Sequence, residues 1–554
     1  MKQFNFNHFS TQFRKSLPSI LVVLLIIIFS SWLMTSTFKY ENGNFLISSR
    51  LWSDFGAHLP LIRSFSRGEN FPPQYPHFAH EPIQYHYGFY LISGILEKIG
   101  VPIDWAVNLP SLIGFGLLLW MIYLIANQIT GKRLAGIIAI VLFSFNGSLT
   151  FVDYFSENGF NAKSVAAIPS LKEFVNFGPW NGDHISAFWN LNIYTNQRHL
   201  GLSYALVLIM VWPILAGKIS RKTKHRSLFW VLVVLALSSI SPLIHKAIVP
   251  IAAVVYMCWG IFFPRQLRYI LPMVGMMLLA SIPLYRHVTP FAEILDIHPG
   301  YLAQGTALLD WIRYWIWNVG AYIMVIPLAF VISSRKIKAM VLASLLLFGV
   351  ANIFQMSTDM INNHKLINFA LVLWAIVAAD IATRVSKLKL IGIPLSLCVI
   401  SIMSFSGVLD LAPIINDRLI PLADAAQSNT QQWILHNTPK QSVFLSSHKF
   451  YNPASLAGRL LYFGYSYFPW SMGYDIADRE AFTREIFAPT TSFQKSCDML
   501  VERDIDYVII SSGAGEIGDT NVQVSSIVQS FKPAYRNETE SHTIYSVSNN
   551  CASL

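Results

Sequence analysis

Eleven apolar runs limit what this chain can fold into. They lie near 17–36, 106–128, 134–152, 199–217, 228–243, 247–263, 269–288, 311–333, 339–355, 366–382 and 390–409. A helix of about 20 apolar residues crosses a hydrocarbon core of about 30 Å, although the run at 228–243 is short. Lipid cannot satisfy exposed backbone groups, so spanning segments of this kind must be helical. The sequence therefore predicts an α-helical polytopic membrane protein with about eleven transmembrane helices.

The charged residues follow the same plan. Only 13% of residues are charged, against about 25% in soluble domains. The net charge is +10, and the basic residues gather between the apolar runs. These short basic stretches are Arg14–Lys15, Lys132–Arg133, Lys218 to Arg226, Arg265 to Arg268, Arg335 to Lys338 and Arg384 to Lys389. Positive turns of this kind are cytoplasmic, so the basic balance records topology and requires no nucleic-acid partner.

This topology divides the chain into two regions. A cytoplasmic N-terminus and an odd number of spans predict a transmembrane module, 1–409, with external loops 37–105 and 153–198. Residues 410–554 then form an extracytoplasmic domain of a plasma-membrane protein. The first apolar run has a basic flank but no clear small-residue cleavage site, which favours an uncleaved signal anchor. Cys497 and Cys551 both lie outside, where the sequence leaves a disulfide between them open.

The C-terminal region changes from apolar runs to alternating short elements. Its pattern predicts helices at 424–436, 479–486, 494–503 and 522–531, strands at 442–445 and 507–510, and an edge strand near 543–547. Helices that alternate with strands indicate a small α/β domain.

Asp54 is the most informative residue of the first external loop. It stands in the segment Leu51-Trp52-Ser53-Asp54-Phe55-Gly56-Ala57-His58, which reads as a short interfacial helix bent at Pro60. In the first turn of that helix the dipole favours an ionised carboxylate. A simple helix-capping role is the plain alternative. An acid held just outside the membrane, however, is placed to act on a hydroxyl while a lipid-linked donor arrives from the bilayer.

The whole plan resembles the GT-C superfamily of membrane glycosyltransferases. That superfamily includes oligosaccharyltransferase catalytic subunits, protein O-mannosyltransferases and lipid A aminoarabinose transferases, and its members carry an acidic residue in the first external loop. Only Asp54 matches that acid. The Asp-Glu and Asp-x-Asp forms found in many members are missing from this loop, which disfavours a metal-dependent version. The resemblance implies inverting transfer of a sugar from a polyprenyl-phosphate donor, with Asp54 as general base. No cofactor is implied, and no ligand spacing supports a divalent cation.

A lipid-phosphate donor needs cations that match its negative charge. Four basic pairs lie at the predicted outer helix ends: Arg198–His199, His245–Lys246, Arg286–His287 and His364–Lys365. Long basic side chains near helix ends often only reach for the interface, but positive residues are depleted outside. His245–Lys246 is the strongest candidate, because Ser241-Pro242-Leu243-Ile244 leaves almost no loop to carry the pair to bulk water. The predicted donor-phosphate residues are His245, Lys246, Arg198, His199, His364 and Lys365.

Aromatic and amide side chains in the external regions are candidates for binding the sugar or the acceptor. Rings cover the apolar face of a sugar and amides bond its hydroxyls, although some tryptophans belong to an interfacial belt. The segment from Ala457 to Asp475 is rich in glycine, aromatic and charged residues and is a candidate to fold down over the membrane site. The predicted residues are His58, His86, Tyr87, Trp180, Asp183, Trp189, Arg459, Tyr465, Trp470 and Asp475.

Two short motifs in the C-terminal region have plainer readings. Gly513-Ala514-Gly515-Glu516-Ile517-Gly518 matches a dinucleotide-binding pattern. It lies in a compartment without a nucleotide pool, which favours a glycine-rich turn. Asp504-Ile505-Asp506 has the Asp-x-Asp form, but it joins a helix to a buried strand and reads as a structural turn.

Other functions remain as alternatives. A transporter is disfavoured because the predicted spans carry almost no charge and no internal repeat is visible. A non-catalytic assembly or sensor protein with a GT-C-like body shares these features, as does a lipid-linked glycan polymerase or ligase. The sequence leaves the acceptor open between a glycan, a lipid and a protein. Binding of a labelled polyprenyl-phosphate sugar, with or without turnover, separates an enzyme from a binding module.

Overall fold

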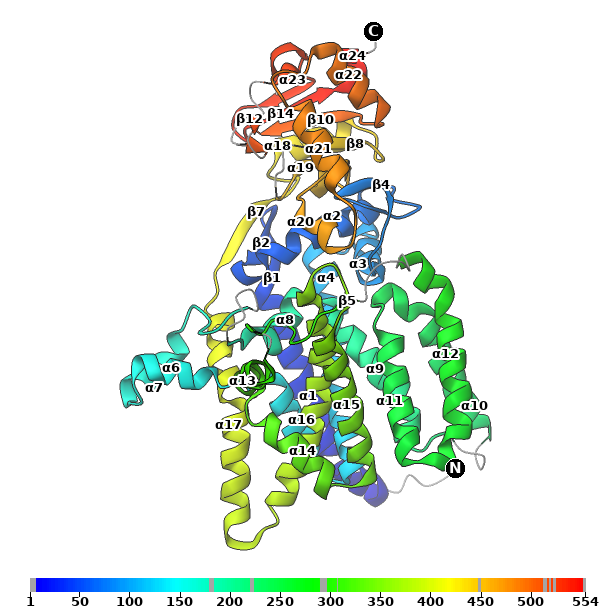
Figure 1. The fold of residues 1–554 in the computed structure, drawn as a ribbon, viewed down its shortest axis with the longest axis vertical. Coiled ribbons are helices and arrows are strands. Elements are labelled where there is room, and N and C mark those ends of the chain that lie inside the picture. The colour runs from blue at the N-terminus through cyan, green and yellow to red at the C-terminus, as the bar shows by residue number, and fades with distance from the viewer. Residues whose placement is uncertain are drawn as a thin grey trace.

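The computed structural model shows a helical bundle that carries a smaller sheet-containing body at one end (Figure 1). It describes residues 6–178, 184–219, 224–288, 296–305, 307–446, 450–511, 516–517, 520–521 and 525–551. The predicted fold class, a polytopic helical protein with a small C-terminal sheet domain, is confirmed.

Long apolar helices make up most of the bundle. Within the described ranges, seven are long and apolar enough to cross a membrane. They are α1 (Phe6–Thr37), α4 (Ile103–Thr130), α10 (Lys224–Ile244), α12 (Leu267–Val288), α15 (Arg335–Ile353), α16 (His364–Val385) and α17 (Lys389–Ile415). α16 is the central helix, because the whole of its apolar window is buried by its neighbours.

The predicted count of eleven spans is not confirmed. An eighth span results if α13 (Leu308–Val319) and α14 (Tyr322–Ile332), which meet at an angle of 92°, are taken as one. The other three apolar runs form shorter helices in the part of the chain that was searched. They are α5 (Arg133–Ser144), α9 (His199–Leu215) and α11 (Ile248–Phe262).

Two of the apolar runs are interrupted where they touch one another. α5 ends at Ser144, and the Asn146 side chain then accepts a hydrogen bond from the Ser148 backbone, a local turn that competes with the helix. Gly320 separates α13 from α14 with a φ of 52°. A Cβ at Gly320 would lie 2.0 Å from the Gly147 carbonyl oxygen. Only glycine fits this position, both for its backbone conformation and for the contact.

The first external loop and the start of the C-terminal region share one sheet. β1 (Phe38–Glu41) and β2 (Asn44–Ser48) form a hairpin, and β7 (Leu419–Ala423) pairs antiparallel with β2. α17 continues to Ile415, beyond the predicted boundary at 409, and leads directly into β7. The remaining elements of the loop are α2 (Trp52–Ser66), β3 (Gln74–Tyr75), β4 (Phe78–Pro82) and α3 (Gly88–Lys98).

A buried ion-pair network joins these two segments. Arg63 of α2 is fully buried, and it contacts Asp424 at 2.8 Å and Glu97 at 3.1 Å. Arg67 approaches the same Asp424 carboxylate at 3.0 Å, and the Tyr40 hydroxyl donates to it. Removing one partner of such a pair leaves a buried charge uncompensated and costs about 3–5 kcal/mol. Asp424 therefore holds the C-terminal domain on the first external loop.

The C-terminal domain is built on a five-stranded sheet of order β13-β14-β10-β8-β9. Its strands are β8 (Val443–Ser446), β9 (Leu460–Leu461), β10 (Tyr507–Ser511), β13 (Tyr535–Asn537) and β14 (His542–Ser546). A strand does form near 543–547, as predicted, but it does not lie at an edge of the sheet. It is β14, which pairs with β10 on one side and with β13 on the other.

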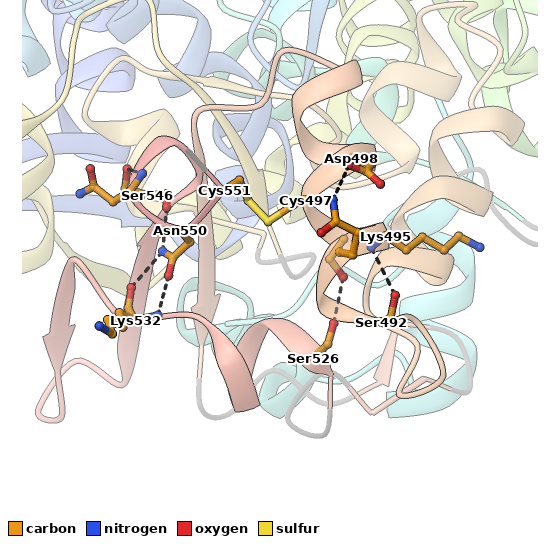
Figure 2. Close-up of a disulfide and its surroundings, with 12 residues drawn as sticks. Ser492, Lys495, Cys497, Asp498, Ser526, Lys532, Ser546, Asn550 and Cys551 are labelled. Atoms are coloured by element: carbon orange, nitrogen blue, oxygen red, sulfur yellow. Dashed lines mark hydrogen bonds between the residues drawn. A yellow bond between two sulfur atoms is a disulfide. The ribbon is translucent and has the colours of Figure 1, made fainter. Parts of the chain in front are cut away.

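Helices flank this sheet, and a disulfide joins two of them. The predicted helices correspond to α18 (Asn429–Asn437), α21 (Ala477–Ile486), α22 (Phe493–Glu502) and α23 (Ser526–Ser530). Figure 2 shows Cys497 of α22 bonded to Cys551 of α24 (Val547–Cys551). The bond spans 54 residues, a loop whose closure stabilises a fold by about 4 kcal/mol in the chain-entropy view.

The topology leads to one prediction for cells. Reporters inserted in the turn at 218–226 and fused after Ile415 should give opposite signals, inside for the first and outside for the second. A periplasmic-type and a cytoplasmic-type reporter at each position supply the internal control. Equal signals from the two positions would reject the predicted orientation. Asp54 and the basic pairs Arg198–His199 and His364–Lys365 would then no longer be expected to form one external site.

Candidate active site

Asp54 lies where the first and second external loops meet. It occupies the first turn of α2 and is half-buried. The Gln197 side-chain amide, between α8 (Leu191–Asn196) and α9, donates a 3.0 Å hydrogen bond to Oδ2 of Asp54. This is the one hydrogen bond to the Asp54 carboxylate within the described residues, so Oδ1 is left without a donor. α2 begins without a side-chain cap, and Asp54 therefore does not serve as one.

The surroundings of Asp54 suit a proton acceptor. Burial raises the pKa of Asp54 to about 6, while the hydrogen bond from Gln197 and the charge of Lys365 act in the opposite direction. The carboxylate is therefore mostly ionised at neutral pH, yet it holds a proton more readily than an exposed aspartate. A general base is most effective when its pKa lies near the working pH.

Three buried imidazoles form a histidine cluster, His86, His199 and His245, at the same end of the bundle. They come from the segment before α3, the first residue of α9 and the turn after α10. Nε2 of His86 lies 2.9 Å from Nε2 of His199, and one ligating nitrogen from each ring lies within 4.8 Å of the others. Among the described residues, these three histidines form a group of side chains close enough together to hold a metal ion.

The histidine cluster is neutral and is continued by a tyrosine. Burial lowers the pKa of both His86 and His245 well below the usual range, and nearby charged groups add to the effect. The Tyr90 hydroxyl of α3 lies 3.2 Å from Nδ1 of His199. The His58 ring of α2 packs 4.8 Å from the Tyr90 ring. These contacts link α2, which carries Asp54, to the cluster.

Two lysines beside the histidine cluster form no ion pair with an acidic side chain among the residues that the structure describes. Lys246 lies in the turn between α10 and α11, and its ammonium group makes neither a hydrogen bond nor an ion pair with any residue that the structure describes. The Lys365 ammonium of α16 donates to Oδ1 of Asn362 at 3.0 Å. The charge of Lys365 reaches both Asp54 and His245. We call Lys246 and Lys365 the lysine pair, which together offer two positive charges to an anion.

The C-terminal domain covers the start of α2 through a residue that precedes the predicted glycine- and aromatic-rich segment, Ala457 to Asp475. The Tyr451 hydroxyl donates to the Trp52 carbonyl at 2.7 Å. Tyr467 of α20 (Tyr467–Ser471) donates to Asp359, which precedes α16, at 2.9 Å. Tyr465 and Trp470 are 37% and 38% exposed and lie on this same segment. Aromatic surface is therefore presented near Asp54 and α16.

Several predicted site residues instead have their polar groups occupied by the protein. The Arg198 guanidinium is fully buried and donates to Thr195, Met34, Asn108 and Thr37. Arg459 binds the last carbonyls of α18, and Asp475 accepts from the backbone at the start of α21. Trp189 donates to Asn318 inside the helical core. These side chains support the architecture around the site.

The remaining predicted residues lie at its margins. His364, beside Lys365, packs edge to face against Phe188 and forms a hydrogen bond with the Asn368 side chain. Tyr87 precedes α3, and its ring lies 6.4 Å from the His287 ring, while Arg286 is exposed at the end of α12. Trp180, Asp183 and most of the motif at 513–518 lie outside the described residues. Asp504 and Asp506 form the expected turn, and the Asp506 carboxylate accepts a hydrogen bond from the Val443 backbone N–H.

Sequence reasoning missed two partners. Gln197, whose side-chain amide donates to Asp54, is not among the predicted site residues. Tyr90 was not singled out, although it contacts His199. The available signal was their neighbours in the sequence, because Gln197 adjoins Arg198–His199 and Tyr90 lies three residues after Tyr87.

Comparison with known proteins adds a family model and solved structures. A family model described as "Uncharacterized membrane protein (DUF2298)" matches residues 57–197. No curated protein matches the chain by sequence. The matched region begins in α2, three residues after Asp54, and includes α3 and the segment that ends at Gln197.

The overall fold is similar to that of solved membrane enzymes. ArnT from Cupriavidus metallidurans, bound to undecaprenyl phosphate, matches with a TM-score of 0.52 and 9% identity over 97% of this chain and 98% of that chain. An Archaeoglobus fulgidus oligosaccharyltransferase, tethered to an acceptor peptide, matches with a TM-score of 0.50 and 11% identity over 90% of this chain and 69% of that chain. The chain therefore has the fold of the GT-C glycosyltransferases, as its sequence suggested.

Proposed function

We propose that this protein is a membrane glycosyltransferase. It takes a sugar from a polyprenyl-phosphate-linked donor and transfers it to an acceptor hydroxyl on the outer face of the plasma membrane. The observation that carries the proposal is that Asp54, which has one free carboxylate oxygen, lies within electrostatic reach of Lys365, and Lys365 within reach of Lys246. Neither lysine forms an ion pair with a carboxylate in the described chain. A proton acceptor and an anion site at the same end of a GT-C fold suit such a transfer.

The reaction divides its work between these two groups. Asp54 Oδ1 removes the proton from the acceptor hydroxyl as its oxygen attacks the anomeric carbon, and inversion follows from attack opposite the leaving group. The bond between that carbon and the phosphate oxygen breaks, and the electron pair leaves with the polyprenyl phosphate. Lys246 and Lys365 bind the phosphate and offset its growing charge. The fold relative that holds undecaprenyl phosphate supports a donor of this class.

Purified protein in lipid nanodiscs tests the proposal directly. It should transfer labelled sugar from at least one polyprenyl-phosphate donor to a cell-envelope extract, and cells without the gene should accumulate that donor. Binding of every donor tested without any transfer would favour the non-catalytic alternative. Stepwise extension of a lipid-linked glycan would instead identify a polymerase.

The Asp54 environment also predicts the pH dependence of transfer. The base must be ionised, so kcat/KM should rise as the pH increases through about 6, the value to which burial raises the pKa of Asp54. Gln197→Leu removes a hydrogen bond that lowers this pKa, and the midpoint should move to higher pH. Gln432→Leu, at an exposed position on α18, is the matched control. Identical pH profiles for all three proteins would show that Gln197 does not tune the base.

A further inference from the structure

We propose that His86, His199 and His245 bind one divalent transition-metal ion of the zinc class. The three side chains bring imidazole nitrogens within 4.8 Å of one another, and all three are at most 4% exposed. The residues are 113 and 46 positions apart along the chain, so the bundle itself assembles the set. No local spacing in the sequence marks it.

The donor atoms select the class of metal. A set of nitrogen ligands suits zinc, cobalt or nickel, whereas magnesium and calcium prefer oxygen. Zinc–imidazole bonds of about 2.0–2.1 Å in a tetrahedral site place the nitrogens roughly 3.3 Å apart. The present separation of 2.9 Å between His86 and His199 is close to that value. Three protein ligands leave a fourth position open, which is the arrangement of catalytic rather than structural zinc.

Neighbouring groups orient two of the rings. The Tyr90 oxygen lies 3.2 Å from Nδ1 of His199, and an Nδ1–H donated there leaves the Nε2 lone pair directed at His86. Ligating histidines commonly have such an outer partner. The Ala247 backbone amide donates to Nδ1 of His245 at 3.1 Å, while Nε2 of His245 is buried without a partner among the described residues. Because Nδ1 accepts this bond, Nε2 carries the ring proton. Ligation by Nε2 therefore requires that proton to move to Nδ1, which gives up the bond from Ala247.

The lysine pair links metal binding to phosphate binding. Lys246 and Lys365 repel a dication, but a phosphate oxygen in the open fourth position would offset part of this positive charge. Metal and phosphate should therefore bind cooperatively, and by linkage each should raise the affinity of the other by the same factor. This part of the inference rests on the proposed function, whereas metal binding by the three histidines does not.

Zinc retention by the full-length protein tests the site. Protein in nanodiscs is stripped with a chelator, titrated with Zn²⁺, desalted and measured for metal content, and Co²⁺ is used to record the visible spectrum of a tetrahedral nitrogen site. We expect about one ion per chain. His86→Ala and His245→Ala should abolish retention, and Tyr90→Phe should weaken binding by about 10–100-fold. His77→Ala, a buried histidine outside the cluster, should retain the ion.

The outcomes separate the metal site from the proposed reaction. Wild-type protein that retains neither Zn²⁺ nor Co²⁺ would overturn the metal site regardless of how the variants fold, and so would equal retention by His86→Ala and His245→Ala. Inorganic phosphate should tighten Zn²⁺ binding in the wild type but not in Lys246→Ala, and the absence of this effect would reject the shared site. Zinc binding without sugar transfer would leave the metal site in place and reject the proposed function.

Discussion

The Asp54→Asn protein should turn over donor roughly 10²–10⁴-fold more slowly than the wild type, the range for loss of a general base. Asparagine keeps the shape of the side chain and still accepts the hydrogen bond from Gln197, but it cannot take the proton of an acceptor hydroxyl. Donor binding and folding should therefore survive. Transfer rates and donor affinity measured on the same nanodisc preparation check both parts.

A matched acid provides the control for this substitution. Asp104 lies in the first turn of α4, at the same end of the bundle, and Asp104→Asn should transfer sugar at nearly the wild-type rate. If Asp54 acted only through the helix end, asparagine would be nearly as good there and would cost little. A correctly inserted Asp54→Asn protein with near-normal transfer would remove Asp54 from the mechanism.

Loss of the Lys246 ammonium should weaken donor binding by about 1.5–3 kcal/mol, the range for a hydrogen bond to a charged group. That corresponds to roughly a 10–150-fold rise in Kd. The reason is that this ammonium has no other partner in the described chain and is half-buried, so the donor phosphate is its natural counter-ion. Lys246→Ala with a fluorescent polyprenyl phosphate measures the effect, and Lys365→Ala should act in the same direction.

Lys98→Ala is the control for this experiment. Lys98 is an exposed lysine at the end of α3, in the same external region, and its loss should leave donor affinity unchanged. If Lys246→Ala also left donor affinity unchanged, Lys246 would be a basic residue that only reaches for the interface. Wild-type affinity in Asp54→Asn combined with low affinity in Lys246→Ala would assign proton transfer and phosphate binding to separate groups.

Hydropathy located the helices of the bundle but not their interruptions. Each of the eleven apolar runs contains a helix, because a helix buried in lipid and a helix buried in protein both need mostly apolar side chains. The breaks at Asn146–Gly147 and at Gly320 depend on a local turn and on a close backbone contact between two distant segments. A window that averages apolar character records neither of these, so it counts broken and shortened helices as full spans.

The candidate site was partly predictable for a related reason. Topology placed Asp54, Lys246 and Lys365 at the same end of the bundle, and the structure brings them there. Arg198, like Lys246, is a basic residue at a predicted outer helix end. Topology could not show that its guanidinium donates to Thr37, Asn108 and backbone carbonyls instead. Nor could it assemble the histidine cluster, because helix packing rather than sequence spacing sets those contacts.

The ion pair between Arg63 and Asp424 has a consequence for biosynthesis. The two residues are 361 positions apart, and a ribosome that adds 5–20 residues per second needs roughly 20–70 s to cover that distance. Throughout this interval α2 has already been synthesised, while the carboxylate that neutralises Arg63 has not. The helix that carries Asp54 therefore reaches its final packing only after the last span has been inserted, which makes the first external loop one of the last parts of the protein to mature.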